Sequence, residues 1–139
     1  MKIFLYYVGK PRDANANELA EEYVRRVGRY ARCEMREIDP ARFDPWTKHP
    51  SATKFLLDPA GKNFDSPQFA KLISGAEQEA RDLVFLVGGA SGLAKDWLGR
   101  PGVLLSLSAM TFPHELARVM LAEQLYRAFT QLRGHPYPK

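Results

Sequence analysis

Short segments rich in apolar or alternating residues are separated along this chain by longer segments with apolar residues every three or four positions. The short segments predict strands over Lys2–Val8, Glu34–Ile38, Ala52–Asp58, Leu83–Val87 and Val103–Leu107. The longer segments predict helices over Glu18–Tyr30, from Ser66 towards Arg81, over Leu93–Leu98, and from Pro113 to about Leu132. This alternation is typical of an α/β fold with a mainly parallel sheet and helices on both faces.

Glycine and proline mark the breaks between these segments. Three prolines in Asp39–Ser51 predict no regular element there, and Pro59-Ala60-Gly61-Lys62 predicts a turn. Ser66 followed by Pro67 predicts a helix start with the serine as its cap. No repeat or long linker divides the chain, so residues 1–139 are predicted to form one domain.

Composition narrows the class of protein. No apolar run approaches the ~20 residues that cross a bilayer, and the apolar start before the first charges is too short for a signal peptide. Cys33 is the only cysteine, which fits a reducing compartment and predicts a cytoplasmic protein. The three histidines and this cysteine show no metal-ligand spacing.

The charge balance is slightly basic, with 20 lysines and arginines against 16 acidic residues. The last part of the chain carries Arg118, Arg127, Arg133 and Lys139 but only one acid, Glu123. Such an excess favours a polyanion such as nucleic acid. The alternative is a solvated helix face, in which Glu123 and Arg127 form an ion pair four residues apart.

Two loops that follow apolar strands are candidates for a ligand site. Gly88-Gly89-Ala90-Ser91-Gly92 would let backbone approach a ligand closely, although a tight turn is an equal alternative. The loop Ser106–Pro113 offers hydroxyls that either cap the last helix or shape a loop that binds an adenine edge. Ser106 or Ser108 with His114 also allows a hydrolase, although the chain lacks a GxSxG elbow and an identifiable orienting carboxylate.

The last helix is apolar on two sides, which predicts burial against its own sheet and against a second subunit. Simple burial inside one chain is the alternative. The tail after it, His135-Pro136-Tyr137-Pro138, has a stiff backbone and an aromatic ring that can stack on a base. Packing of that tail against its neighbour is the other interpretation.

Four motifs, in order, resemble the bacterial 23S rRNA pseudouridine-N3 methyltransferases, which belong to the SPOUT class of knotted methyltransferases. They are Gly88-Gly89-Ala90-Ser91-Gly92, Leu105 to His114, Glu123-Gln124-Leu125-Tyr126-Arg127-Ala128 and His135-Pro136-Tyr137. The resemblance implies a C-terminal trefoil knot, a homodimer, and S-adenosylmethionine as methyl donor with no metal. The implied donor-binding residues are Leu57, Gly89, Ser108, Ala109, Met110, Thr111, Phe112 and Pro113.

The same resemblance implies a substrate, a pseudouridine in 23S rRNA of the assembled ribosome, methylated at N3. His135 and Tyr137 are the residues expected to contact the target base. His114, Arg118 and Arg127 are further candidates for the catalytic set, with the two arginines holding phosphate or structure.

Two departures from the family pattern concern activity. Pro138 stands where the tail of the family commonly has a histidine, and only Asp39–Ser51 occupies the place of a further helix. The alternative function is therefore a catalytically impaired protein of the same fold that binds RNA or the ribosome.

Overall fold

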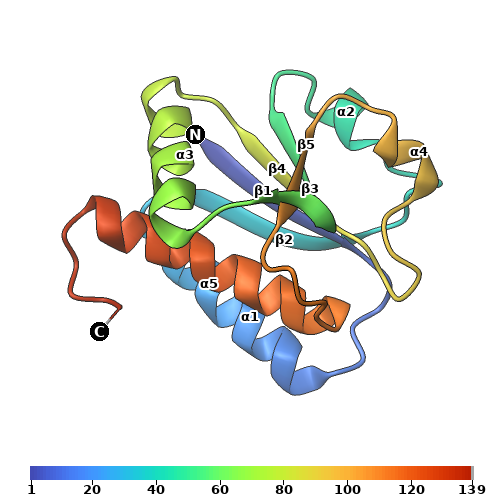
Figure 1. The fold of residues 1–139 in the computed structure, drawn as a ribbon, viewed down its shortest axis with the longest axis horizontal. Helices are drawn as coiled ribbons and strands as arrows, with labels where there is room; N and C mark the ends of the chain where they lie inside the picture. The colour runs from blue at the N-terminus through green and yellow to red at the C-terminus, as the bar shows by residue number, and fades with distance from the viewer. Residues whose placement is uncertain (139) are drawn as a thin grey trace.

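The computed structural model describes residues 1–138, so Lys139 lies outside the described residues. One sheet of five parallel strands has the order β2-β1-β4-β3-β5 (Figure 1). The strands are β1 Lys2–Val8, β2 Arg32–Ile38, β3 Thr53–Asn63, β4 Leu83–Val87 and β5 Val103–Ser106. The helices are α1 Ala14–Val27, α2 Pro45–Lys48, α3 Ser66–Gln78, α4 Lys95–Leu98 and α5 His114–Leu132. The predicted α/β fold with a parallel sheet is confirmed.

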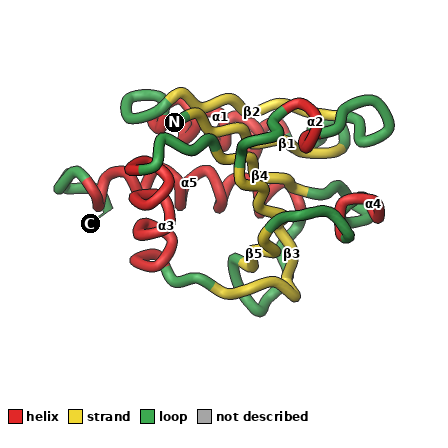
Figure 2. The backbone as a smooth tube through the Cα atoms, turned by 90° about the horizontal axis from the view of Figure 1, so that it is seen from above, coloured by secondary structure: helices red, strands yellow, loops and turns green. Residues whose placement is uncertain are grey.

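Alternation along β1 sends side chains into two separate cores, one on each face of the sheet. Ile3 and Leu5 are fully buried in the core with Leu125 of α5. Phe4 and Tyr6 belong to a second core that includes the tryptophans of α2 and α4. Helices α1, α3 and α5 pack together on the first face, and the one-turn helices cover the second (Figures 1 and 2). The prediction of helices on both faces holds.

Helix starts differ from the predicted ones because aspartates act as caps. The Asp13 side chain accepts a hydrogen bond from the Ala16 backbone N–H at 3.1 Å, so α1 begins at Ala14 rather than Glu18. For α3 the cap is Asp65 in a capping box with Gln68, and Ser66 is the first helical residue instead of the cap.

Two predictions about loops are wrong in part. Residues 39–51 contain the one-turn helix α2, because Asp44 accepts a hydrogen bond from the Trp46 N–H and Pro45 suits the first helical position. The turn predicted at residues 59–62 lies inside β3. Leu57 and Lys62 both pair with Leu105, so the residues between them form a bulge within the strand.

The two edges of the sheet carry different strands. At one edge β2 pairs only with β1. Arg32, Glu34 and Arg36 of β2 are exposed. At the other edge β5 has four residues, of which Leu104 is exposed. Within residues 1–138 no further strand pairs with the outer side of β2 or of β5.

The second core contains a histidine whose titration is expected to affect stability. His49 Nε2 lies 2.7 Å from the Tyr6 hydroxyl oxygen, and its ring centroid lies 4.1 Å from that of Phe4. Burial, followed by the charges of Lys48 and Lys54, lowers the pKa of His49 below its usual 6.5.

A folded-state pKa below the unfolded one means that folding favours the neutral ring. The stability due to His49 is therefore complete above about pH 6.5 and is lost as the pH falls through its folded pKa. We expect His49→Gln to flatten the fall in unfolding free energy between about pH 7.5 and about pH 5.5. Urea denaturation at both pH values measures this, with His135→Gln at an exposed position as control. Parallel pH curves for wild type and His49→Gln would contradict the assignment.

Candidate active site

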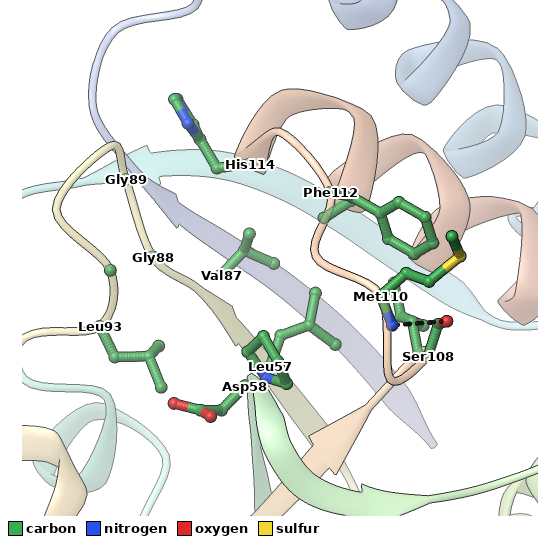
Figure 3. Close-up of a pocket in the computed structure, with 14 residues that line it drawn as sticks. Leu57, Asp58, Val87, Gly88, Gly89, Leu93, Ser108, Met110, Phe112 and His114 are labelled. Carbon is green, nitrogen blue, oxygen red and sulfur yellow. Dashed lines mark hydrogen bonds between the residues drawn. The ribbon is translucent and has the colours of Figure 1, made fainter.

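A cavity of about 170 Å³ lies between the bulge of β3 and the carboxyl ends of β4 and β5, and it opens to the surface (Figure 3). Its lining residues are Leu57, Asp58, Pro59, Val87, Gly88, Gly89, Gly92, Leu93, Leu107, Ser108, Met110, Phe112, His114 and Ala117. Mostly apolar walls with a few polar groups at strand ends are typical of ligand sites in parallel α/β sheets.

The glycine-rich loop after β4 folds back on itself so closely that position 88 has no room for a side chain. A Cβ on Gly88 would lie 2.4 Å from the carbonyl carbon of Gly92. Gly92 has a φ of +85°, and its N–H donates to the Gly89 carbonyl oxygen at 2.9 Å. A Cβ on Gly89 would lie 3.0 Å from the Val8 carbonyl oxygen. The tight turn and the cavity wall are thus the same feature.

The bulge in β3 supplies the acidic side of the cavity. The Asp58 Oδ1 accepts a hydrogen bond from the Ala60 N–H at 2.8 Å, which shapes the turn within the strand. Asp58 therefore lies at the cavity rather than within a regular ladder. Figure 3 shows its carboxylate beside Leu93, on the opposite side of the cavity from Met110 and Phe112.

Serine hydroxyls hold the loop between β5 and α5. The Ser106 hydroxyl donates to the Ser108 carbonyl oxygen at 2.8 Å, and the Ser108 Oγ accepts from the Met110 N–H at 3.0 Å. Helix α5 begins after Pro113 without a side-chain cap. Within residues 1–138 no hydrogen bond joins either serine to His114, and Ser106 is 1% exposed. The nucleophile–base contact that a serine hydrolase needs is therefore missing from the described structure.

The residues proposed to hold the methyl donor gather at this cavity. Leu57, Gly89, Ser108, Met110 and Phe112 line it. Ala109, Thr111 and Pro113 are the other members of the proposed set and belong to the same loop, outside the lining. His114, from the proposed catalytic set, lines the cavity as well.

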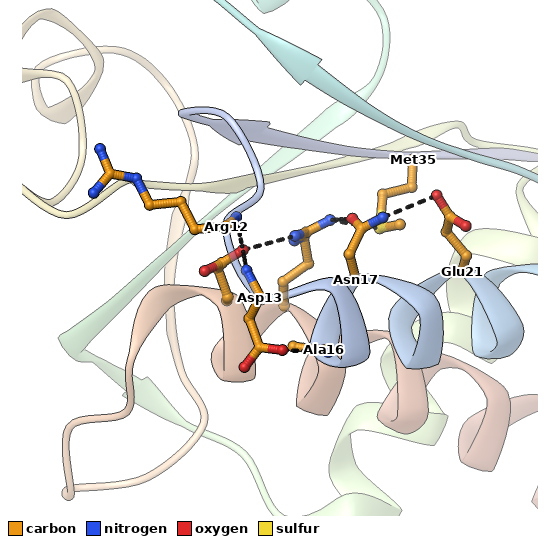
Figure 4. A network of polar contacts seen from close by, with 8 residues as sticks. Arg12, Asp13, Ala16, Asn17, Glu21 and Met35 are labelled. Atoms are coloured by element: carbon orange, nitrogen blue, oxygen red, sulfur yellow. Dashed lines mark hydrogen bonds and ion pairs between the residues drawn. The ribbon is translucent and has the colours of Figure 1, made fainter.

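Arg118 lies one turn further along α5 and is buried, with 1% of its surface exposed. Its guanidinium lies 3.8 Å from the Tyr7 ring centroid, and Nη1 donates to Asn17 Oδ1 at 2.8 Å (Figure 4). Nη2 lies 3.9 Å from a Glu115 carboxylate oxygen and has no hydrogen-bond partner among the described residues. In one chain this arginine ties α5 to β1 and α1.

The tail packs on the far part of α5. The Tyr137 hydroxyl donates to Glu123 Oε2 at 2.5 Å, and Arg127 donates to the same oxygen at 2.8 Å. Burial and the Glu123 carboxylate raise the pKa of Tyr137 above its usual 10. Glu123 is nine residues, or about 14 Å of helix, from His114. His135, exposed, lies beyond the end of α5.

The proposed catalytic residues thus occupy three places in one chain: the cavity, the interior behind it, and the far end of α5. Sequence reasoning did not single out Asp58, Glu115 or the contact of Glu123 with the tail. Asp58 could have been found from the Asp58-Pro59 pair at the end of a predicted strand, where turns and ligand sites are common. The roles of Glu115 and of the contact between Glu123 and the tail depend on parts of the chain that are distant in sequence.

A family profile described as "Predicted SPOUT methyltransferase" matches residues 1–138. The chain belongs to the SPOUT methyltransferase family. It is 63% identical over 137 residues to a Solibacter usitatus protein named "Ribosomal RNA large subunit methyltransferase H", covering 99% of each chain. It is 39% identical over 150 residues to a protein of that name from Gloeobacter violaceus, covering 99% of this chain and 98% of the relative.

Solved structures agree with the SPOUT fold at low sequence identity. A probable methylase family protein from Haemophilus influenzae matches with a TM-score of 0.65 at 10% identity, over 99% of this chain and 70% of that one. An AdoMet-bound rRNA methyltransferase from Sinorhizobium meliloti matches with a TM-score of 0.54 at 13% identity, over 91% of this chain and 56% of that one.

This SPOUT protein is a methyltransferase, and S-adenosylmethionine is the methyl donor of the family. Among residues 1–138 there is no cluster of three or more His, Cys, Asp or Glu side chains placed to hold a metal ion. None of the described helices combines the length and apolar character needed to cross a bilayer.

Proposed function

We propose that this methyltransferase transfers a methyl group to N3 of a pseudouridine in 23S rRNA, on the assembled ribosome in the cytoplasm. The observation that carries the proposal is the cavity formed by the glycine-rich loop and the loop before α5, which gathers the residues expected to bind the donor. Relatives that align along nearly the whole chain are named for methylation of large-subunit rRNA, which supports the substrate class.

The cavity has the chemistry that the donor requires. Leu57, Leu93 and Leu107 offer apolar surface for an adenine ring, and Asp58 offers a carboxylate for hydroxyl or amino donors. The absent side chains at Gly88 and Gly89 let the backbone of this loop pack closely against Gly92 and Val8 at the cavity wall. S-adenosylmethionine supplies a methyl group on a positively charged sulfur, which makes that methyl reactive towards a nucleophilic nitrogen.

N3 of the base carries a proton that must leave for the nitrogen to act as a nucleophile. His114 lies at the cavity and is our candidate to interact with the base or its proton there. Tyr137, with its raised pKa, remains a protonated phenol at neutral pH and acts as a donor or stacking surface. His135 and Arg127 complete the proposed contacts with substrate. Arg118, being buried, serves structure in this proposal.

The proposed assembly is a homodimer that completes this site. Met110, Phe112, Leu116 and Met120 are between 40% and 74% exposed, forming an apolar surface beside the cavity. The cavity is smaller than the ~300 Å³ or more usual for small-molecule sites and is open on one side. Because the tail packs about 14 Å along α5 from His114, we propose that a second copy provides a tail at each cavity. The trefoil knot implied by the family remains a prediction.

Calorimetry with S-adenosylmethionine and methylation of 70S ribosomes from a strain lacking this modification test the proposal together. We expect donor binding, and incorporation of one methyl group per ribosome at N3 of the base. Binding without transfer would favour the alternative of an impaired RNA-binding protein, and absence of both would refute a methyltransferase role. Light scattering that gives only a 15.8 kDa species would refute the homodimer.

Substitution of Pro138 by histidine is expected to raise the activity of this protein. It follows Tyr137 directly, so a histidine there would place an imidazole beside the proposed base-contacting ring. We expect Pro138→His to raise kcat on ribosomes by a few-fold to about tenfold, because a correctly placed acid or base contributes at least that much. Donor affinity should remain unchanged. Pro138→Ala is the control, and equal rates for both variants would remove the role assigned to a tail histidine.

A further inference from the structure

The connection between β1 and α1, residues 9–13, runs outside the cavity lining beside the wall residues Gly89 and His114, and we call it the rim loop. Its first end is fixed where Val8 packs against Gly89 of the cavity wall. Its other end is fixed by Glu115, which follows the cavity residue His114 in the chain. Figure 3 shows the backbone that leaves β1 passing beside Gly89 and His114. The rim loop is therefore held beside Gly89 of the wall at one end and by the residue after His114 at the other.

Glu115 holds the rim loop through two backbone groups. Its Oε1 accepts hydrogen bonds from the Arg12 N–H at 2.8 Å and the Asp13 N–H at 3.2 Å (Figure 4). These bonds, with lesser contributions from His114 and the Arg118 guanidinium, lower the pKa of Glu115, so the carboxylate is ionised at neutral pH. A carboxylate shared by two consecutive N–H groups fixes the direction of the loop at Arg12.

The side chains that the rim loop presents are basic and unpaired. Lys10 and Arg12 are exposed, and no ion pair within residues 1–138 includes either of them. The one acid in the loop, Asp13, is used as the cap of α1. The Glu115 carboxylate lies in the first turn of α5 and offsets the positive end of that helix dipole, so the attraction for an anion comes from Lys10 and Arg12.

We propose that the rim loop is a phosphate-binding site for the substrate RNA, in which Lys10 and Arg12 contact the backbone beside the target nucleotide. Glu115 is the positioning residue that holds the loop for this contact. The inference rests on the proposed function, because it assigns an RNA substrate to the cavity. Phosphate contacts fix the register of a nucleic acid while base contacts select the nucleotide, so a site beside the cavity wall aligns the base for entry. A loop held in advance loses less entropy on binding.

Glu115 separates this proposal from a simple charge effect. If only net charge mattered, removing the carboxylate would strengthen binding of a polyanion. If the carboxylate positions the loop, Glu115→Ala weakens binding although the protein becomes more positive. Glu115→Gln keeps an oxygen that can accept the two N–H bonds, so it should retain the position of the loop.

The experiment measures methylation of unmodified 70S ribosomes, with KM and kcat for ribosomes and calorimetric affinity for S-adenosylmethionine. The variants are Lys10→Gln, Arg12→Gln, Glu115→Ala and Glu115→Gln. Arg29→Gln is the control, since Arg29 is exposed beyond the opposite end of α1 and loses the same charge. Thermal unfolding midpoints show which variants are folded.

We expect Lys10→Gln, Arg12→Gln and Glu115→Ala each to raise KM for ribosomes about tenfold, with donor affinity unchanged. The slope of log KM against log salt should fall by about one for each lost cation. Glu115→Gln and Arg29→Gln should stay within about twofold of wild type. An active wild type with unchanged KM in Arg12→Gln, or a lowered KM in Glu115→Ala, would overturn the rim-loop proposal alone. A wild type without methylation would instead overturn the proposed function.

Discussion

Gly88→Ala is expected to abolish binding of S-adenosylmethionine, with affinity falling at least ~100-fold. The added Cβ would lie 2.4 Å from the carbonyl carbon and 2.6 Å from the next backbone nitrogen of the loop, so backbone must move. A loop displaced by even about an ångström no longer offers the same donors and acceptors at the cavity. Calorimetry with the donor measures the loss directly.

Two further glycines provide a graded control for this result. Gly89→Ala places its Cβ 3.0 Å from the Val8 oxygen, so a smaller loss of donor affinity is expected. Gly75→Ala lies in α3 with nothing within 4 Å, and should raise stability by about 0.5–1 kcal/mol without affecting the donor. Equal donor affinity in Gly88→Ala and Gly75→Ala would show that the glycine-rich loop does not bind it.

Arg118→Met is expected to lower the unfolding free energy by roughly 3 kcal/mol. The substitution removes the donor to Asn17 and the cation over the Tyr7 ring, and it leaves Glu115 without its nearest guanidinium. Methionine fills much of the volume, so the loss reports the polar contacts rather than a large cavity. Urea denaturation at neutral pH gives the value.

Arg127→Met is the matched control for Arg118→Met. Arg127 forms its ion pair with Glu123 at a position that is 29% exposed, so the expected loss is below about 1 kcal/mol. A stability loss for Arg118→Met no larger than that for Arg127→Met would contradict a structural role of Arg118. Arg118 would then be better regarded as a contact for phosphate.

Most of the fold was predictable because strands and helices bury side chains with different periods. The mostly apolar run Lys2–Val8 predicted a buried strand, and α5 was predicted from Pro113 to Leu132, close to its observed bounds. The errors lie where a side chain redirects the local backbone. Asp13 starts α1 early, Asp44 starts α2, and the Asp58 turn is absorbed as a bulge in β3.

The candidate site was predictable as far as parallel strands bring their carboxyl ends together. This rule alone places the loops after β4 and β5 at one edge of the sheet, where the cavity lies. The position of the tail could not be inferred in the same way. It depends on how the chain after α5 turns back along this helix, which brings Tyr137 onto Glu123, nine residues from His114. The role of Glu115 depends on a contact across more than 100 positions in the chain.

The two edges of the sheet restrict how copies of this chain associate. Exposed charged side chains along β2 discourage a further strand from pairing there, and β5 is too short to template an extended strand. Fibril-like growth through backbone pairing is therefore disfavoured at both ends of the sheet. Self-association is left to side-chain packing of the helical layer, where the exposed apolar residues of α5 lie. An isologous contact made in that way would close at two copies, as the proposed homodimer requires.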